Sequence, residues 1–438
     1  MRYDLIIIGG GTTGSVAAVS AARQGLNTLL IEKASFLGGL ATGGMVTPWM
    51  SPQANNVYVN RGMSEEIIKR MHQYGWGGTA QGSNGWYYPE GLKIVLEEMV
   101  LEAGAKILYD TVFVSCSRDG GALRSIRIYN KEGFTGLEAD FFLDTTGDAD
   151  LAASAECSML EDVGKQATSL RFAMGNIDLD KFKKWVNTKT GETVMSGDLV
   201  EGYMIWGRGE ILEPLFRQGV EKGILKQADG NYVQYFSVPG YKNSIFFNCP
   251  EIPLEINVLK GDEVTKAYIE GHRAIMRFRN FFRSMVPGFD EAEIMQMASQ
   301  LGVRVSRRIH GEYVMTADDV LKGRSFEDAI CRNAYPVDIH HLEEEKIGAM
   351  MGGAPEGGYN QVPYRIMLPK GLDNLLVAGR SISAEFTAQS ALRIQRVCHN
   401  LGEAAGVAAA LAKKHDCLLK KVPVKEMQDI LKQTGGLI

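Results

Sequence analysis

The sequence lacks the features that mark several large classes of protein. Its 438 residues contain no uninterrupted run of about 18 apolar residues, the length that a membrane-spanning helix needs. Six cysteines form no C-x-x-C pair, so neither a zinc site nor a redox dithiol is encoded locally. Lys and Arg number 47 against 52 Asp and Glu, a net charge of −5 that leaves no global nucleic-acid footprint. We therefore expect a soluble, cytoplasmic protein without a metal site and without nucleic-acid or membrane partners.

The sequence does contain a regular pattern of predicted elements at its start, and it is rich in glycine. The pattern predicts a buried strand over residues 3–8, an Ala-rich helix over 12–25 and a second strand over 28–32. This β-α-β order indicates a parallel sheet. Many of the 50 glycines are clustered, which marks places where backbones approach closely. The clusters lie at 9–14, 38–44, 75–91, 352–358 and 402–406.

The first of these clusters is a dinucleotide fingerprint. Gly9-Gly10-Gly11-Thr12-Thr13-Gly14 is G-x-G-x-x-G between a predicted strand and a predicted helix, and Glu32 closes the next strand. Gly9 makes the tight turn, Gly11 lets the backbone approach the pyrophosphate, and Gly14 permits close packing of helix on strand. The helix N-terminus offers free N–H donors to phosphates, and Glu32 can accept hydrogen bonds from ribose hydroxyls. The sequence therefore predicts a bound dinucleotide.

Three later segments favour FAD over NAD as that dinucleotide. Ser35–Gly44 is a glycine-rich stretch after the ribose-binding acid, Leu143–Asp148 ends a strand in Thr-Gly-Asp, and Asn374–Arg380 ends another in Gly-Arg. A second G-x-G-x-x-G is absent, which argues against a separate NAD(P)H domain. The stretch 35–50 has no histidine that could attach a flavin covalently.

At these residues the chain resembles FAD-dependent oxidoreductases of the glutathione-reductase-2 and fumarate-reductase-like type. The resemblance also covers Val305–Ile309, Val362–Arg365 and Val377–Ala384. It implies that the fingerprint holds the pyrophosphate, Glu32 the ribose and Val112 the adenine surroundings, while the other segments lie along the flavin. The implied FAD-binding residues are Gly9, Gly11, Thr12, Thr13, Gly14, Glu32, Lys33, Gly38, Gly39, Ala41, Thr42, Gly43, Gly44, Val112, Thr146, Gly147, Asp148, Gly379, Arg380 and Arg393.

These observations predict an α/β fold with a discontinuous Rossmann-like FAD-binding domain. Residues 1–165 form its first part, and 370–415 complete it with a strand and a small-residue helix over 394–413. The stretch 166–369 mixes aromatic residues and prolines with weaker periodicity, and we expect it to form an inserted α+β substrate domain. Residues 416–438 are expected to form a C-terminal extension.

A basic segment in the inserted part supplies candidate catalytic residues. Val303–Val314 alternates as a strand, which would place Arg304, Ser306, Arg308 and His310 on one face. Arginines bind carboxylates in bidentate fashion, and a histidine moves protons near neutral pH. The alternative is a solvated face or a set of structural ion pairs.

Other segments leave two interpretations open. Tyr364 and Arg365 are candidates for substrate binding, or else for packing and an interdomain salt bridge. Tyr335–His341 holds an acid and two histidines, which are weak evidence for a metal and favour an acid/base or structural pair. Cys398 and His399 are expected to pack inside the last helix. The aromatic residues Trp76, Trp86, Tyr87 and Tyr88 form either a lid or part of the core.

We therefore expect an FAD-dependent oxidoreductase that performs two-electron hydride transfer on a small, anionic substrate, with an electron donor or acceptor that the sequence does not identify. A non-catalytic flavin-binding sensor is one alternative. A flavoprotein that modifies RNA is another, although the acidic net charge argues against it.

Overall fold

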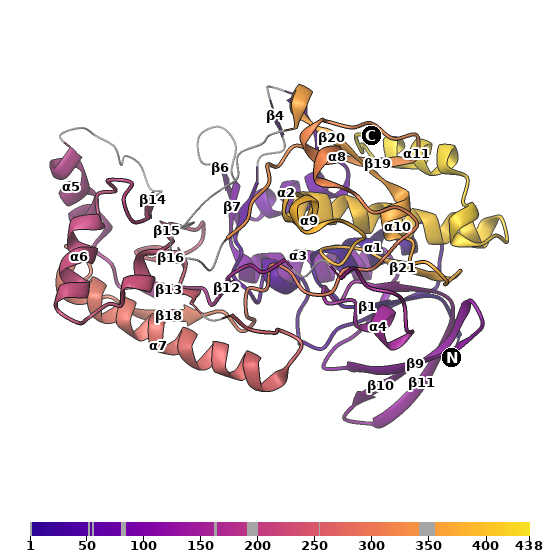
Figure 1. Ribbon diagram of the computed structural model, residues 1–438, viewed down its shortest axis with the longest axis horizontal. Helices are drawn as coiled ribbons and strands as arrows, with labels where there is room; N and C mark the ends of the chain where they lie inside the picture. Colours follow the sequence, from indigo (N-terminus) through magenta and orange to yellow (C-terminus); the bar gives the residue numbers. More distant parts are fainter. Residues whose placement is uncertain are drawn as a thin grey trace.

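The computed structural model describes residues 2–50, 53–54, 57–79, 85–161, 164–190, 200–253, 255–340 and 355–438. Two layered bodies lie end to end (Figure 1). One contains both termini and the long helix α10, and the other contains the aromatic-rich sheet with helix α7 along it. This arrangement is α/β with a parallel sheet in the first body, as predicted.

The first body is built on a sheet with strand order β8-β2-β1-β11-β10-β9, and β21 also pairs with β11. The pairs β8–β2, β2–β1, β1–β11 and β11–β21 are parallel, whereas β9, β10 and β11 form an antiparallel meander. The strands are β1 (Arg2–Ile8), β2 (Thr28–Ile31), β8 (Lys106–Leu108), β9 (Val112–Asp119), β10 (Ala122–Asn130), β11 (Gly133–Asp144) and β21 (Leu375–Val377). A strand from the C-terminal part therefore completes the N-terminal sheet.

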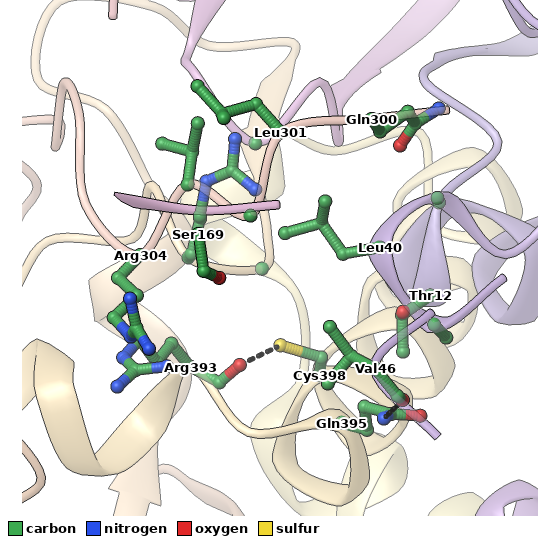
Figure 2. A pocket seen from close by; sticks show the side chains of 18 of the residues that line it. Thr12, Leu40, Val46, Ser169, Gln300, Leu301, Arg304, Arg393, Gln395 and Cys398 are labelled. Carbon is green, nitrogen blue, oxygen red and sulfur yellow. Dashed lines mark hydrogen bonds between the residues drawn. The ribbon is translucent and has the colours of Figure 1, made fainter. Parts of the chain in front are cut away.

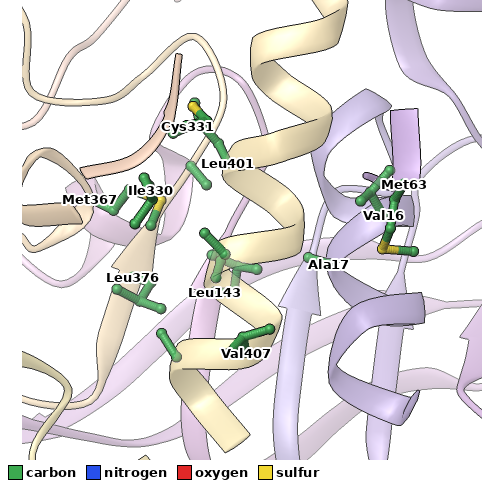
Figure 3. Close-up of a cluster of buried hydrophobic side chains, with 14 of the residues drawn as sticks. Val16, Ala17, Met63, Leu143, Ile330, Cys331, Met367, Leu376, Leu401 and Val407 are labelled. Atoms are coloured by element: carbon green, nitrogen blue, oxygen red, sulfur yellow. The ribbon is translucent and has the colours of Figure 1, made fainter. Parts of the chain in front are cut away.

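Helices α1 (Thr12–Arg23) and α10 (Gln395–Lys414) pack directly on each other. A Cβ on Gly402 would lie 2.3 Å from the carbonyl oxygen of Thr13, so this contact requires glycine. Figure 3 shows the apolar cluster around α10, where Leu401 and Val407 lie near side chains from β11 and β21. The two ends of the chain thus share one core.

The second body is a five-stranded antiparallel sheet with order β14-β15-β16-β13-β18. Its core is aromatic: Phe172 stacks on Phe247 with ring centroids 4.6 Å apart, and Phe278 and Phe282 of α7 pack against them. The elements are α5 (Leu179–Thr190), α6 (Glu213–Glu221), α7 (Gly261–Met285), β13 (Phe172–Gly175), β14 (Glu201–Met204), β15 (Val233–Phe236), β16 (Ile245–Asn248) and β18 (Glu293–Met297).

Smaller elements connect the two bodies and cover the first. They are α2 (Met63–Gln73), α3 (Pro89–Glu102), α4 (Asp150–Ser154), α8 (Ala317–Leu321), α9 (Phe386–Leu392), α11 (Val424–Gln433), β3 (Pro48–Trp49), β4 (Gln53–Ala54), β5 (Val57–Tyr58), β6 (Gly77–Thr79), β7 (Gly85–Tyr87), β12 (Thr168–Ser169), β17 (Glu251–Ile252), β19 (Ala329–Asn333) and β20 (Asn360–Pro363). Among the described helices, none combines the length and apolar character that crossing a bilayer requires.

The packing suggests where the inserted domain ends. Most of the buried apolar residues between Met315 and Leu368 belong to the same apolar cluster as α1 and α10, whereas the aromatic cluster extends only as far as Val303. Met427 and Leu431 of α11 also join the first cluster. We propose that the inserted domain spans about 166–303, and that 304–369 and 416–438 belong to the first domain.

The predicted strand over Val303–Val314 is wrong. Residues 303–308 have no regular secondary structure, and the following residues form isolated bridges: Ile309 with Met159, Gly311 with Pro369, and Met315 with Ala384. Each bridge involves a different segment, so no continuous ladder forms. The apolar and basic residues of this segment therefore contact several different parts of the chain and do not form the two faces of a strand.

Candidate functional site

One cavity of about 1430 Å³ extends from the carboxyl ends of the parallel strands to the face of the second sheet. Its wall includes the fingerprint at one end and residues of β14, β15 and β16 at the other. Figure 2 shows this space, with Arg304 and Arg393 side by side on one side and Thr12, Gln395 and Cys398 on the other. Single-ligand pockets are usually about 300–1000 Å³. The size therefore accommodates a dinucleotide together with a second molecule.

The fingerprint end provides free backbone donors. Gly9 has φ +100°, and a Cβ there would lie 2.6 Å from the carbonyl oxygen of Thr145, so the tight turn needs glycine. A Cβ added at Gly11 would have its nearest neighbouring atom 3.9 Å away, which leaves the backbone open to the cavity. Helix α1 begins there without an acidic residue in its first turn or a side-chain cap. Its first N–H groups can therefore bind phosphate.

Glu32 supports the loop as well as lining the cavity. Its Oε2 accepts a hydrogen bond from the Gly10 N–H at 2.6 Å, and its Oε1 accepts one from the Ala34 N–H at 2.8 Å. Burial raises the pKa of Glu32, while these backbone donors oppose the shift. Each carboxylate oxygen keeps a further lone pair, which a ribose hydroxyl can use.

The Thr-Gly-Asp turn and the Gly-Arg turn meet through Asp148. The Asp148 Oδ1 accepts hydrogen bonds from the Ser306 hydroxyl at 2.6 Å and from the Arg380 guanidinium at 2.9 Å. Burial acts to raise the pKa of Asp148, but Arg380 and Ser306 outweigh it, and the pKa is lowered. The Arg380 guanidinium lies over Gly147, where a Cβ would be 2.8 Å from Cζ. Asp148 therefore joins three separate segments at the cavity wall.

The structure brings most of the predicted cofactor residues to the cavity. Those on its wall are Gly9, Gly11, Thr12, Thr13, Glu32, Lys33, Gly39, Ala41, Val112, Thr146, Gly147, Asp148, Gly379, Arg380 and Arg393. The others, Gly14, Gly38, Thr42, Gly43 and Gly44, stand behind it. Gly43, for example, accepts hydrogen bonds at its carbonyl oxygen from the N–H groups of Ser299 and Gln300. These five residues shape the lining rather than forming it.

The beginning of α10 forms another part of the wall. The Gln395 amide donates a hydrogen bond to the Val46 carbonyl oxygen at 2.7 Å, which fixes the segment that follows the second glycine cluster. Cys398 also lines the cavity, which differs from the expectation that it packs inside the helix. Burial raises the pKa of its thiol to about 11.

Four residues of the wall, Arg304, Asp338, His340 and Arg393, form an alternating chain of charges with Glu251, and we call these five residues the charged wall. Arg304 Nη2 lies 3.0 Å from Glu251 Oε1, and the same oxygen lies 2.6 Å from His340 Nδ1. His340 Nε2 is 3.2 Å from Asp338 Oδ1, and Asp338 Oδ2 is 3.2 Å from Arg393 Nη2. Burial works against the ionised carboxylates, but the neighbouring cations lower the pKa of both Glu251 and Asp338. The acid and histidine of the Tyr335–His341 segment are thus joined by ion pairs.

Arg171 lies beside this wall without a carboxylate of its own. It is buried and lines the cavity, its Nη1 donates to the Met45 carbonyl oxygen at 3.2 Å, and its Nε has no partner among the described residues. Among the described residues, no Asp or Glu side chain forms an ion pair with Arg171. Burial, followed by the nearby Arg304, lowers the pKa of Arg171 to about 10, so it stays charged at neutral pH.

Arg171 was missed by the sequence reasoning, although a signal exists. It is a single charge in the apolar stretch Leu170–Met174, directly before β13. Arginine is almost never fully buried without a partner, so an isolated arginine beside a core strand indicates a ligand or a structural role.

Of the candidate catalytic residues, only Arg304 lines the cavity. Arg308 is buried and donates to the Ala384 carbonyl oxygen at 2.7 Å, and His310 lies 3.0 Å from the Lys370 ammonium. The Tyr364 hydroxyl donates to the Leu419 carbonyl oxygen, and Arg365 pairs with Asp328 at 2.9 Å. The structure therefore does not bring these four residues into the site. Arg308 and His310 point elsewhere because the segment 303–314 is not a strand with one common face, whereas Tyr364 and Arg365 are held by Leu419 and Asp328.

Of the four aromatic residues that suggested a lid, Trp86 and Tyr87 lie in the core, whereas Trp76 and Tyr88 are partly buried. Trp86 stacks on Phe236 with centroids 3.9 Å apart, and Tyr87 stacks on Trp49 at 4.2 Å. Trp86 and Tyr87 are both buried. His341 of the acid–histidine segment lies outside the described residues. In the parts of the chain that the structure describes, no cluster of three or more His, Cys, Asp or Glu side chains could hold a metal ion.

Residues 4–431 match the family described as FAD dependent oxidoreductase. Digeranylgeranylglycerophospholipid reductase 3 of Methanosphaera stadtmanae is 26% identical over 201 residues, which cover 41% of this chain and 48% of that protein. A 3-oxosteroid 1-dehydrogenase of Mycolicibacterium smegmatis is 51% identical over 38 residues, which cover 9% and 7%. The chain thus spans less than half the length of these curated relatives.

Among solved structures, a geranylgeranyl bacteriochlorophyll reductase-like protein from Thermoplasma acidophilum aligns with a TM-score of 0.49 and 13% identity. That alignment covers 99% of this chain and 83% of the other. The match over 4–431, which includes the fingerprint and the C-terminal segment that completes its sheet, is decisive. The chain belongs to the family of FAD-dependent oxidoreductases, and its cofactor is FAD.

Proposed function

We propose that the protein is an enzyme that uses FAD to perform two-electron hydride transfer on a small organic anion, which binds at the end of the cavity formed by Arg171 and Arg304. The observation that carries this proposal is the buried Arg171 guanidinium, which lines the cavity and has no carboxylate partner among the described residues. A buried charge of this kind is costly unless an anion neutralises it. A substrate carboxylate would supply that anion.

The residues present fit FAD at the other end of the cavity. The open Gly11 backbone and the uncapped start of α1 would hold the pyrophosphate, and Glu32 the ribose. The start of α10 also lacks an acidic first turn, so its positive end would face the flavin. When bound, FAD supplies a two-electron acceptor or donor of hydride.

The charges support an anion as the second ligand. The charged wall and Arg171 together hold three guanidinium groups against two carboxylates, even when His340 is neutral. In a buried site with reduced dielectric, this excess attracts an anion more strongly than it would in water. Guanidinium groups also orient a carboxylate through paired hydrogen bonds, which would align the substrate relative to the cofactor.

The first experiment is an absorbance spectrum of the purified protein, recorded before and after dithionite and then with a panel of carboxylates under anaerobic conditions. We expect flavin bands that one class of carboxylate bleaches or shifts. Arg171→Met should keep the flavin spectrum and weaken carboxylate binding at least about tenfold, since a charge-assisted hydrogen bond to a buried group is lost.

Arg124→Met is the matched control, because the ion pair of Arg124 among the described residues is an exposed one with Asp119 on the meander. This variant should keep the flavin spectrum and the carboxylate affinity of the unchanged protein. Unaltered carboxylate binding in Arg171→Met would contradict the proposal. A flavin that no compound of the panel reduces, in a protein that still binds ligands, would instead favour the sensor.

A further inference from the structure

The cavity has a third region, which neither the cofactor nor an anionic group would use. We infer that this region holds an apolar chain attached to the anion, so that the substrate is an amphiphilic carboxylate rather than a short, fully polar acid. This inference rests on the proposed function, because it takes the anion to lie at Arg171 and Arg304.

The third region is lined by apolar side chains from two segments. Val264 and Tyr268 stand one turn apart on α7 and therefore share a face of that helix. Leu301 and Val303 come from the segment that leaves the second sheet, and Val258 precedes α7. We call these five residues the apolar branch.

Tyr268 presents mainly its ring to the cavity. The Tyr268 hydroxyl accepts a hydrogen bond from the Leu301 N–H at 2.8 Å, which ties α7 to the returning segment. Because the hydroxyl oxygen is held against this backbone, the surface that the apolar branch offers to a ligand is mainly hydrocarbon and ring. A polar substrate would gain nothing there, whereas an apolar chain would be removed from water.

The apolar branch is continuous with the cationic end. Leu301, Val303 and Arg304 all line the cavity and lie within four consecutive residues. Three peptide units span at most about 10 Å, so the Cα atoms of Leu301 and Arg304 are no farther apart than this. Figure 2 shows Leu301 and Arg304 at two edges of the same open space. A ligand held at its anionic group by Arg304 can therefore place its chain along the branch.

The apolar branch also reaches the surface. Val258, Val264 and Tyr268 are partly exposed, and the neighbouring Leu259 is 45% exposed. An apolar chain could enter here ahead of its carboxylate, or extend out of the cavity if it is longer than the branch. The opening therefore admits ligand chains of different lengths, provided that they are apolar.

The test is a binding series with straight-chain carboxylates from acetate to decanoate, kept below the concentrations at which they form micelles. Binding to the flavin-loaded protein is followed by titration calorimetry and by the flavin spectrum. Each methylene that leaves water contributes about 0.8 kcal/mol, so Kd should fall about fourfold per carbon until the branch is filled. The dependence on chain length should then level off.

Val264→Asp should flatten this series while leaving the Kd of acetate unchanged. Ile269→Asp is the matched control, since Ile269 lies on the same helix, is 46% exposed and does not line the cavity among the described residues. It should keep the full dependence on chain length. If Val264→Asp does not fold, Val264→Phe serves instead, because it fills the branch and should shorten the longest chain that still gains affinity.

The outcomes separate the two proposals. Carboxylates that bind through Arg171 but gain no affinity with chain length would overturn the apolar branch and leave the proposed function intact. Failure of every carboxylate to bind would overturn the proposed function itself. A length dependence that Val264→Asp and Ile269→Asp retain equally would place the chain somewhere else and refute the assignment to the branch.

Discussion

Replacing two glycines of the fingerprint by alanine should have different effects. The substitution at Gly14 should destabilise the apoprotein, whereas the one at Gly11 should weaken FAD binding. A Cβ at Gly14 would lie 1.9 Å from the carbonyl oxygen of Gly9 and 2.5 Å from Thr145 Oγ1. Ordinary van der Waals contact begins near 3.4 Å, so the backbone would have to move by more than 1 Å to relieve the clash. Gly11 has φ −70° and open space where a Cβ would point, which makes alanine harmless to the apoprotein.

Overpacking of this kind costs about 1–3 kcal/mol, and a clash with backbone belongs at the upper end. At roughly 2–4 °C per kcal/mol for a large domain, a cost of about 3 kcal/mol means that Gly14→Ala should lower the Tm of the apoprotein by about 6–12 °C. Gly11→Ala should leave that Tm unchanged and weaken FAD binding strongly, because its Cβ would occupy the approach of the pyrophosphate. Gly136→Ala is the control, since nothing lies within 4 Å of its Cβ.

The assay is thermal unfolding of the three apo variants, followed by FAD titration of each. The reasoning fails if Gly11→Ala destabilises the apoprotein as much as Gly14→Ala does, because the two glycines would then share one packing role. It also fails if Gly14→Ala unfolds at the wild-type temperature.

Three further predictions concern buried polar groups. Burial lowers the pKa of His399 from 6.5 to about 3, so the neutral histidine contributes its full stabilisation above pH 6.5. The free energy of unfolding should fall by up to about 1.4 kcal/mol per pH unit as the pH drops toward 3. Denaturant unfolding of His399→Leu at several pH values should show a smaller decrease of this free energy. Asp148→Asn should destabilise the holoprotein by about 2 kcal/mol in the same assay, since the charge that Arg380 and Ser306 contact is removed. The Cys398 thiol, with its pKa raised by burial to about 11, should react slowly with thiol reagents at pH 8, and slower still when FAD is bound; rapid labelling of the holoprotein would contradict its position.

The sequence predicts the first body well because its signals are local. The fingerprint, the strand before it and the helix after it are adjacent in the chain, and β1, α1 and β2 form where the periodicity places them. The small-residue helix near the C-terminus is also recovered as α10, since Gly402 is needed wherever a helix lies this close to a neighbouring backbone. Local propensity and tertiary packing agree in these elements.

The second ligand site is harder to predict because its residues are distant in sequence. Arg171, Arg304 and His340 reach one cavity from segments that are far apart in the sequence, and no spacing pattern links them. Arg308 shows the opposite error. The segment around Arg308 alternates as a strand would, but it bridges to three unrelated segments instead of joining a sheet. The Arg308 guanidinium donates to the Ala384 carbonyl oxygen and does not line the cavity.

The pairing of β21 with β11 and of α10 with α1 bears on how the protein is made. Helix α1 leaves the ribosome well before its partner α10, which is synthesised more than 370 residues later. Until then the apolar face of α1 lacks its partner, and the wall around Gly379 and Cys398 does not exist. The cofactor can therefore load only after α10 has been synthesised, and nascent chains should depend on chaperones that shield this face.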